Sequence, residues 1–350
     1  MCSKPIKMWI DGACFKIKEF HKIKKPKLAL HSNKEEECTA AAEDDHKFIL
    51  TKTASDTFST SFQLPSIYYI RLNAFKDFSL DELKLQTHTN ITIPKNGSDG
   101  HIQIVGNSES DVIDARQQMH SVIGAIREHL SPTQFIQIPV NSEEIKRNFE
   151  QFKKEILTGD PIPGVEESIF QSPIKLHLTI AVSVLLSDSE KEEAIAALNT
   201  CKSEIIEPFL FTKGHLKIKV TGIDCMNDNF SKVNVLYAKA KVDSEDEDVL
   251  QKLADSISDY FYDRGLVVQY KNNVKLHVTL MNTRYRHSST QSSPTKSRWY
   301  ARRQSFDARG ILKTYKDFYF GESSLNSVHL SYMSLKDEDG FYKPLSMVTL

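Results

Sequence analysis

Two short segments of this sequence carry the same five-residue pattern. Residues 175–179 read Lys-Leu-His-Leu-Thr and residues 275–279 read Lys-Leu-His-Val-Thr, so His177 and His277 lie 277 − 177 = 100 residues apart. One neutral histidine can take a proton from an attacking water or hydroxyl group, while a second, protonated histidine gives a proton to the leaving oxygen. A pKa near ~6.5 lets both protonation states exist near neutrality. The repeat therefore indicates acid–base chemistry on a phosphodiester.

Both copies have the alternation that is typical of a β-strand, in which successive side chains point to opposite faces. The side chains predicted to face the core are Leu176, Leu178 and Ile180 in the first copy, and Leu276, Val278 and Leu280 in the second. The opposite faces would present Lys175, His177 and Thr179, and Lys275, His277 and Thr279. If the two strands lie side by side by pseudo-twofold symmetry, the threonine hydroxyls can hold the nonbridging phosphate oxygens and the lysines can bind substrate.

Two other interpretations of these histidines stay open. A single His-x-Thr on an amphipathic strand is usually a surface or core-edge histidine, although two copies favour a functional site. The second alternative is a metal site with His329 as a third ligand. No Asp, Glu or Cys stands at ligand spacing from either motif, so the sequence predicts no metal and no other cofactor. His329 is then interpreted as a strand histidine or a residue on the rim of the cleft.

The elements that must position the motifs occupy residues 134–350. Strands are predicted at residues 135–140, 176–185, 216–220, 233–241 and 275–281, and helices at residues 142–157, 188–201 and 246–264. Ser142 is the expected N-cap of the first helix. A Ser-rich loop is expected at about residues 287–297. This order indicates an α+β domain with mixed or antiparallel sheets.

A smaller module is predicted at residues 60–131. Strands are expected at residues 67–72, 90–94 and 101–106, and helices at residues 80–87 and 108–129. This strand-helix-strand-strand-helix order resembles a KH domain, in which a G-x-x-G loop clamps a nucleic-acid backbone.

The loop expected to form that clamp departs from the KH pattern. Residues 73–78 contain no glycine, and Asp77 would repel a phosphate. A modified clamp would use Lys76 together with base stacking on Phe75 or Phe78. The competing interpretation is a KH-like module that only holds partners or braces the next domain.

Residues 1–55 are predicted to form a flexible tail, because a basic stretch at residues 16–27 and an acidic stretch at residues 35–45 offer little apolar surface to bury. The basic stretch is either a nuclear localisation or polyanion-binding signal or a solvated tail. Trp9, Ile10 and Phe15 are apolar residues in this polar segment, with Asp11 and Gly12 as an expected turn. They predict a partner-docking motif; the alternative is that Trp9 folds back onto this protein.

Composition restricts the remaining possibilities. The net charge is −1, so nucleic-acid binding must come from a local patch. The five cysteines are scattered and form no C-x-x-C pair, which argues against a disulfide framework and favours a reducing intracellular compartment. No apolar run approaches the ~18 residues of a membrane span, so no membrane association is expected.

The motifs also carry a resemblance to known families. The paired H-[LV]-T-[IL] strands at this spacing resemble the 2H phosphoesterase superfamily, which includes RNA ligase-like proteins and cyclic-nucleotide phosphodiesterases. A KH-like module before such a domain, together with further matching segments, resembles the small-subunit family of the activating signal cointegrator complex over about residues 65–335. These segments are residues 164–170, 226–228, 235–239, 274–282, 305–312 and 318–321, and more weakly residues 10–16.

The resemblance implies a KH-like module followed by a bilobal 2H domain, with the catalytic roles on His177, Thr179, His277 and Thr279. It further implies a nuclear protein that binds single-stranded RNA or a nucleotide and associates with the helicase subunit of a complex. That complex is active in transcription coactivation and in the response to alkylated DNA. The alternative within the same family is a non-catalytic RNA-binding regulatory or scaffold subunit.

Overall fold

The computed structural model describes residues 6–10, 13–17, 50–52, 56–76, 78–95, 98, 100–244, 246, 248–267, 273–286 and 304–350. The Ser-rich loop expected at residues 287–297 and most of the basic and acidic stretches lie outside these residues. The chain divides into two compact units. Unit 1 contains residues 1–131, 184–191 and 263–268, and unit 2 contains residues 132–183, 192–262 and 269–350.

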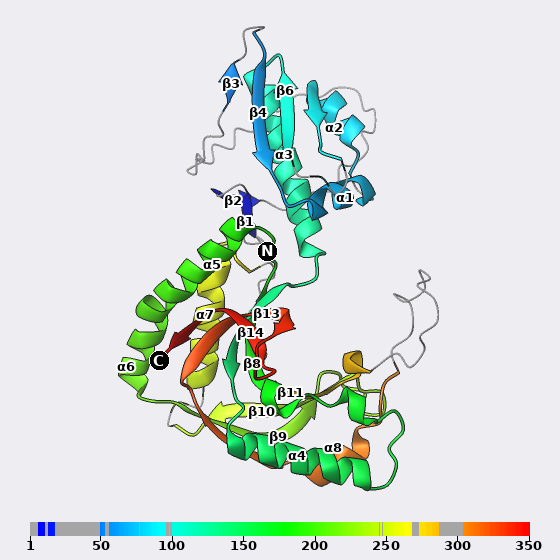
Figure 1. Ribbon diagram of the computed structural model, residues 1–350, viewed down its shortest axis with the longest axis vertical. Helices are drawn as coiled ribbons and strands as arrows, with labels where there is room; N and C mark the ends of the chain where they lie inside the picture. The colour runs from blue at the N-terminus through cyan, green and yellow to red at the C-terminus, as the bar shows by residue number, and fades with distance from the viewer. Residues whose placement is uncertain are drawn as a thin grey trace, which may run out of the picture. The chain divides into compact units, whose positions relative to one another are not determined.

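Unit 1 contains a four-stranded antiparallel sheet in the order β3-β4-β6-β5 (Figure 1). Helix α3 packs its apolar side chains, at helical spacing, into a core with β4, β5 and β6. The elements are β3 (Thr51–Lys52), β4 (Phe58–Gln63), α1 (Ile67–Ala74), α2 (Leu80–Gln86), β5 (Thr89–Thr92), β6 (His101–Gly106) and α3 (Glu109–Glu128). The helices and strands expected from residue 80 to residue 129 are thus confirmed, with shifts of a few residues at their ends.

The strand predicted at residues 67–72 is wrong, because this segment forms helix α1. Its composition of isoleucine and tyrosine favours a strand locally, but Tyr68, Tyr69 and Leu72 are the residues that it buries, and this spacing fits one face of a helix. The first strand is instead β4, in which Thr60 and Phe62 are buried between exposed polar residues. From β4 onward, the observed order is therefore strand-helix-helix-strand-strand-helix.

A buried ion pair lies in unit 1. Arg127 of α3 donates to the carboxylate of Glu190 and to the carbonyl oxygen of Val184, and both charged residues are almost fully buried. Glu190 also accepts hydrogen bonds from the backbone N–H groups of Leu186 and Ser187 at 2.6 and 3.0 Å. Because both charges are paired and hydrogen-bonded, their desolvation is largely offset.

Two short strands lie in the N-terminal segment that was predicted to form a flexible tail. Strands β1 (Ile6–Ile10) and β2 (Ala13–Ile17) pair antiparallel, with Trp9 opposite Cys14 and Ile10 opposite Ala13. Asp11 and Gly12, the expected turn, lie outside the described residues. The hydrogen bonds between the two strands satisfy backbone groups that a tail would leave to water. The predicted docking residues therefore lie on a β-hairpin.

Unit 2 is built on one eight-stranded antiparallel sheet in the order β12-β9-β10-β11-β8-β7-β13-β14 (Figure 1). Its two halves meet where β11 pairs with β8. The strands are β7 (Gln134–Pro139), β8 (His177–Ser183), β9 (Lys217–Cys225), β10 (Val235–Val242), β11 (Val278–Asn282), β12 (Tyr319–Ser324), β13 (Ser327–Lys336) and β14 (Tyr342–Thr349). The expected α+β class with antiparallel strands and a two-halved architecture is confirmed.

Helices and short turns connect these strands. They are α4 (Glu143–Thr158), η1 (Glu167–Ile169), η2 (Pro173–Lys175), α5 (Asp188–Cys201), η3 (Lys202–Ile206), α6 (Glu207–Lys213), α7 (Val249–Asp263), η4 (Thr283–Tyr285) and α8 (Arg309–Tyr315). The helix predicted to end at Cys201 continues through η3, a π-helical turn, into α6. Pro208 has no N–H to donate within the helix, so a local change of hydrogen-bond pattern is expected there.

The start of α4 confirms the predicted cap. The hydroxyl of Ser142 accepts a hydrogen bond from the N–H of Ile145 and donates to the carbonyl of Glu322 at 2.7 Å. The carboxylate of Glu144 accepts from the N–H of Glu322 at 3.0 Å. The helix that begins at the cap is thereby also tied to the edge strand β12.

Candidate active site

The two His-x-Thr motifs lie on adjacent strands at the centre of the unit 2 sheet. Leu178 of β8 pairs with Val278 of β11 in an antiparallel register, and both side chains are fully buried. Continuing this register places His177 across from Thr279 and His277 across from Thr179. The two imidazoles and two hydroxyls therefore share the sheet face opposite the core, as the alternation predicts.

The core-facing predictions agree with the structure except at one position. Leu176, Leu178 and Ile180 are buried in the first copy, and Val278 and Leu280 are buried in the second. Leu276 is only half-buried. It precedes β11 and so lies outside the regular alternation of the strand.

His177 is held by hydrogen bonds at both ring nitrogens. Its Nδ1 lies 2.7 Å from the carbonyl oxygen of Lys175, so Nδ1 carries the proton and donates. Its Nε2 lies 3.1 Å from the hydroxyl of Thr179 and can accept from it. Desolvation by burial lowers the pKa of His177 to about 4, against the opposing effect of the carbonyl of Lys175, and His277 and Lys175 lower the pKa further. His177 is therefore neutral at physiological pH.

His277 repeats the first of these interactions. Its Nδ1 lies 2.6 Å from the carbonyl oxygen of Lys275, which matches the contact between His177 and Lys175. Both motifs therefore orient the ring through the carbonyl of the residue two positions earlier. This orientation directs Nε2 of each histidine to the same face of the sheet.

The two lysines are not held by strand alternation as predicted. Lys175 ends the 3-10 turn η2 before β8 begins, and Lys275 precedes β11 by three residues. Their ammonium groups lie instead over tyrosine rings, Lys175 at 4.5 Å from the centroid of Tyr342 and Lys275 at 5.1 Å from that of Tyr237. Desolvation lowers the pKa of Lys175, and Lys336 adds to this effect.

Aromatic residues that the sequence did not single out surround His177. The rings of Phe135, His177 and Tyr342 pack against one another, with centroid distances of 4.9 to 5.2 Å. Tyr237 is the corresponding neighbour of His277, at 5.6 Å. Tyr237 lies within one of the segments that carry the family resemblance, whereas no local pattern marks Phe135 or Tyr342.

A polar network lies beside this aromatic cluster. The side chain of Gln171 donates to the hydroxyl of Tyr285 at 2.9 Å, and it also interacts with the hydroxyl of Tyr342. Burial raises the pKa of Tyr285 to about 12, so its phenol stays protonated and can donate. Gln171 thus links Tyr342 to Tyr285, which follows β11.

His329 lies on the same face but two strands away from Thr179. The register pairs His329 with Gln137, and Gln137 with Thr179. The Nε2 of His329 is 2.8 Å from the hydroxyl of Ser327, and its Nδ1 is buried. Within the described ranges, no group of three or more His, Cys, Asp or Glu is arranged to hold a metal ion. The position of His329 agrees with a strand histidine near the rim of the site.

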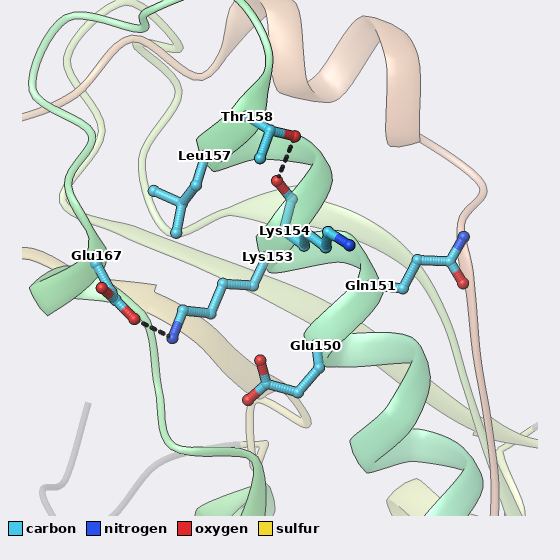
Figure 2. Close-up of a pocket in the computed structure, with 7 residues that line it drawn as sticks. All are labelled: Glu150, Gln151, Lys153, Lys154, Leu157, Thr158 and Glu167. Carbon is cyan, nitrogen blue, oxygen red and sulfur yellow. Dashed lines mark hydrogen bonds and ion pairs between the residues drawn. The ribbon is translucent and has the colours of Figure 1, made fainter.

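A separate groove of unit 2 follows helix α4 and contains none of the motif residues (Figure 2). Its volume is about 590 Å³, and charges of both signs line it, with Lys153 paired to Glu167 at 2.9 Å. This internal pairing offers no net charge for an anionic substrate. The motif face of the sheet is therefore the candidate active site.

In unit 1, residues 75–79 join α1 to α2, and Asp77, which was expected to repel a phosphate, lies outside the described residues. Lys76 is exposed. Phe75 and Phe78 are half-buried and pack against the core of the unit, and Phe75 also contacts the ring of His129 at 6.3 Å. Base stacking on Phe75 or Phe78 stays a prediction, and both rings also pack against the core of unit 1.

The sequence pattern of the AKAP7 2'5' RNA ligase-like domain matches residues 132–350, which include both motifs. The chain belongs to this 2'5' RNA ligase-like family of 2H phosphoesterases. The resemblance inferred from the paired motifs is confirmed by this match.

A relative covers most of the chain. The mouse (Mus musculus) protein "Activating signal cointegrator 1 complex subunit 1" is 34% identical over 292 residues, which are 81% of this 2H family member and 82% of the mouse protein. The finer resemblance to the subunit family of this complex is thereby also confirmed.

Solved structures show more distant similarity. Escherichia coli LigT complexed with 3'-AMP has a TM-score of 0.35 and 14% identity, covering 63% of this chain and 97% of that chain. The protein TT0787 of Thermus thermophilus has a TM-score of 0.39 and 15% identity, covering 62% and 97%. No helix among the described residues is long and apolar enough to cross a membrane.

Proposed function

We propose that unit 2 is a metal-independent phosphodiesterase that acts on an RNA-type phosphodiester or cyclic phosphate, with His177 as general base and His277 as general acid. The observation that carries this proposal is the pairing of β8 with β11, which brings two imidazoles and two threonine hydroxyls to one face. Two histidines in opposite protonation states can catalyse this reaction without a metal.

The assignment of the base follows from the surroundings of His177. Its Nδ1–H donates to the Lys175 carbonyl, so the lone pair of Nε2 can accept a proton. Burial, which lowers the pKa of His177, keeps the ring neutral and ready to act as a base. In the proposed step Nε2 of His177 takes the proton of the attacking water or hydroxyl while the new P–O bond forms. His277 gives a proton to the leaving oxygen as the old P–O bond breaks, and exchange with solvent restores both residues.

The remaining motif residues stabilise charge on the phosphate. We assign the hydroxyls of Thr179 and Thr279 to the nonbridging oxygens, since the register places each beside the opposite histidine. Lys175 and Lys275 are assigned to substrate binding, because each ammonium is held on a tyrosine ring at the edge of the site.

A substrate panel tests this proposal. The full-length chain would be incubated with linear and 2′,3′-cyclic-ended oligonucleotides in the presence of EDTA, and products identified by mass spectrometry. We expect cleavage that EDTA does not inhibit and that His177→Ala abolishes. Cleavage by both proteins alike would identify a contaminating nuclease, and loss of cleavage on adding EDTA would favour a metal mechanism.

We also propose that unit 1 binds single-stranded RNA in the manner of a KH domain. A groove of about 520 Å³ lies between α2 and β5 and includes Lys84 and Lys95, and the exposed Lys76 follows α1. Lysines along a groove provide the salt-dependent attraction that a phosphate backbone requires. If Lys76→Glu and Phe75→Ala both leave RNA affinity unchanged, unit 1 is a brace and not an RNA-binding module.

The mouse relative is named as a subunit of a complex, and we propose the same kind of assembly for this chain. The β1–β2 hairpin, which carries Trp9, Ile10 and Phe15, would dock on the helicase subunit of a nuclear complex that acts in transcription coactivation and alkylation repair. Deleting residues 1–20 should remove co-purification with the helicase while leaving phosphodiesterase activity intact. A fall in melting temperature with partner binding retained would instead indicate that the hairpin packs on this protein.

The second candidate function is a non-catalytic regulatory or scaffold subunit that binds RNA. The mouse relative's description as a complex subunit favours it. The two candidates differ in the substrate panel, because a scaffold would bind the oligonucleotides and release them unchanged.

A further inference from the structure

Tyr342, the first residue of β14, contacts both the lysine and the histidine of the first motif. Its ring lies 5.1 Å from that of His177 at an interplanar angle of 80°, and the ammonium of Lys175 lies 4.5 Å from its centroid. The ring of Tyr342 also packs against the ring of Phe135, with the two centroids 4.9 Å apart and an interplanar angle of 83°. One tyrosine ring therefore touches the lysine and the histidine of the motif at once.

The second motif has the same arrangement around a different tyrosine. Tyr237 of β10 lies 5.6 Å from the ring of His277 at 73°, and the ammonium of Lys275 lies 5.1 Å from its centroid. Tyr237 lies between the two motifs in sequence, whereas Tyr342 lies near the end of the chain. The same arrangement is thus built from unrelated segments.

A residue that holds the lysine beside the histidine is needed because each motif begins outside regular strand structure. Lys175 ends a 3-10 turn and His177 begins a strand, so strand alternation does not bring their side chains together. A ring face attracts an ammonium group through the cation–π interaction, and a ring edge packs against a second ring. A carboxylate partner would neutralise the lysine, but an aromatic ring leaves its charge available to a phosphate oxygen.

We propose that Tyr342 and Tyr237 are positioning residues, each of which holds the lysine and the histidine of one motif in a fixed arrangement. The inference rests on the proposed phosphodiesterase function, but its first test needs no turnover. Neither tyrosine is assigned a chemical step.

The two tyrosines differ in what they do to the histidine. Tyr342 and Phe135 together enclose His177, and burial is the main reason why its pKa falls to about 4. Lys175 and His277 act electrostatically on His177, and the ring of Tyr342 packs against it. Lys336 and Asp337 in turn act on Lys175. Removing the Tyr342 ring would admit water and release Lys175, and both changes raise the pKa of His177.

The direct test is an NMR titration of His177 in the full-length chain. We expect Tyr342→Leu to move the pKa of His177 from about 4 towards its ordinary value of 6.5, and Tyr342→Phe to leave it low because the ring stays. Tyr319→Leu is the matched control, since Tyr319 also lies near a lysine ammonium, that of Lys219 at 6.0 Å, on the edge strand β12. Tyr319→Leu should leave the pKa of His177 unchanged.

Two outcomes would overturn the role of Tyr342. One is a folded Tyr342→Leu variant with an unchanged His177 titration, and the other is an equal shift in Tyr342→Phe. If Tyr342→Leu does not fold, Tyr342→Met is used in its place, because methionine keeps most of the apolar volume. The same rise in the pKa of His177 is expected.

Kinetics then test both tyrosines on a substrate identified in the panel. A misplacement of about 1 Å at a reacting group can cost roughly 10²-fold in rate, so Tyr342→Leu and Tyr237→Leu should each lower kcat by up to about that factor, with recovery in the Phe variants. An unchanged kcat in both Leu variants would overturn the proposal, even if KM rises, because a histidine that is no longer held in place should slow the chemical step. If the pKa of His177 rises in Tyr342→Leu and stays low in Tyr342→Phe, but no substrate of the panel is turned over, the phosphodiesterase function is rejected and the positioning role is retained.

Discussion

The two copies of the Lys-Leu-His-x-Thr pattern have nearly the same sequence and different surroundings. His177 packs against the rings of Phe135 and Tyr342, and His277 packs against the ring of Tyr237. The imidazoles of His177 and His277 both donate a hydrogen bond from Nδ1 to the carbonyl of a lysine two residues earlier. The orientation of the imidazole is thus set locally, while burial of the ring is set by strands from elsewhere in the chain.

This difference suggests how a repeated motif can perform two tasks. An acid–base pair needs one neutral and one protonated histidine, and identical surroundings would not distinguish them. Enclosure of the first ring favours its neutral form, because desolvation penalises charge. In the proposed mechanism, burial of His177 by the surrounding strands, and not the motif itself, keeps this histidine neutral as the base.

The largest expected effect comes from removing either histidine. His177→Ala and His277→Ala should each lower kcat/KM by about 10²- to 10⁴-fold, and the double variant should be little worse than either single one, because the two residues act as a unit. Turnover of folded protein, verified by circular dichroism, measures this. His329→Ala provides the control. Wild-type activity in either single variant would contradict the paired mechanism.

The lysines should have the next largest effects. Lys175→Ala and Lys275→Ala should each weaken substrate binding about 10- to 100-fold, since a hydrogen bond to a charged group contributes about 1.5–3 kcal/mol. Only Lys175→Ala should also raise the pKa of His177, because Lys175 lowers that pKa in the native protein. KM and an NMR titration separate the two effects. An equal shift in both variants would remove the asymmetry between the motifs.

Stability should depend on pH through His177. Its native pKa of about 4 lies below the ordinary 6.5, so the unfolded chain binds a proton in this interval and the native protein does not. The contribution of His177 to the free energy of unfolding is therefore fully present above pH ~6.5 and is lost as the pH falls towards ~4. The melting temperature should therefore fall by roughly 2–4 °C for each kcal/mol lost.

The histidine variants identify the source of this pH dependence. His177→Gln should make the melting temperature less sensitive to pH in the same interval. His120 of unit 1, whose pKa burial lowers to about 3, should contribute a similar loss, so His120→Gln is the comparison. If His177→Gln melts with the wild-type pH dependence, His177 is not held neutral by the fold.

The smallest expected effect concerns unit 1. Lys76→Glu should weaken single-stranded RNA binding a few-fold and reduce its salt dependence, because one phosphate contact releases about one counterion. Fluorescence anisotropy at several salt concentrations measures this. Lys52→Glu, at another exposed position of unit 1, is the matched control, and equal losses in both variants would indicate only a general charge effect. Equal affinity for duplex RNA would contradict a single-strand groove.

The sequence alone was sufficient where the signal is local. Strand alternation predicted which residues of β8 and β11 face the core, helical periodicity predicted α3, and Ser142 marked the start of α4. These features depend on neighbours within a few residues, which a sequence displays directly. The repeated pattern also made a paired site predictable before any strand order was known.

Local signals failed where tertiary contacts override them. Residues 67–72 have the composition of a strand, but α1 forms because its buried face packs on the core of unit 1. The pairing of β1 with β2 was not predicted, because it depends on hydrogen bonds between two strands. Propensity is a weak preference that such packing readily reverses.

The difference between the two histidines was decided only by the tertiary structure. Tyr342 and His177 are in contact although they lie 342 − 177 = 165 residues apart in the sequence. No sequence pattern near either residue predicts this contact. Spacing along a chain shows which residues can share a face, but the burial that shifts a pKa depends on every strand packed around the ring. The sequence therefore determined that there are two histidines facing one site, and the folded sheet determined the burial that keeps His177 neutral.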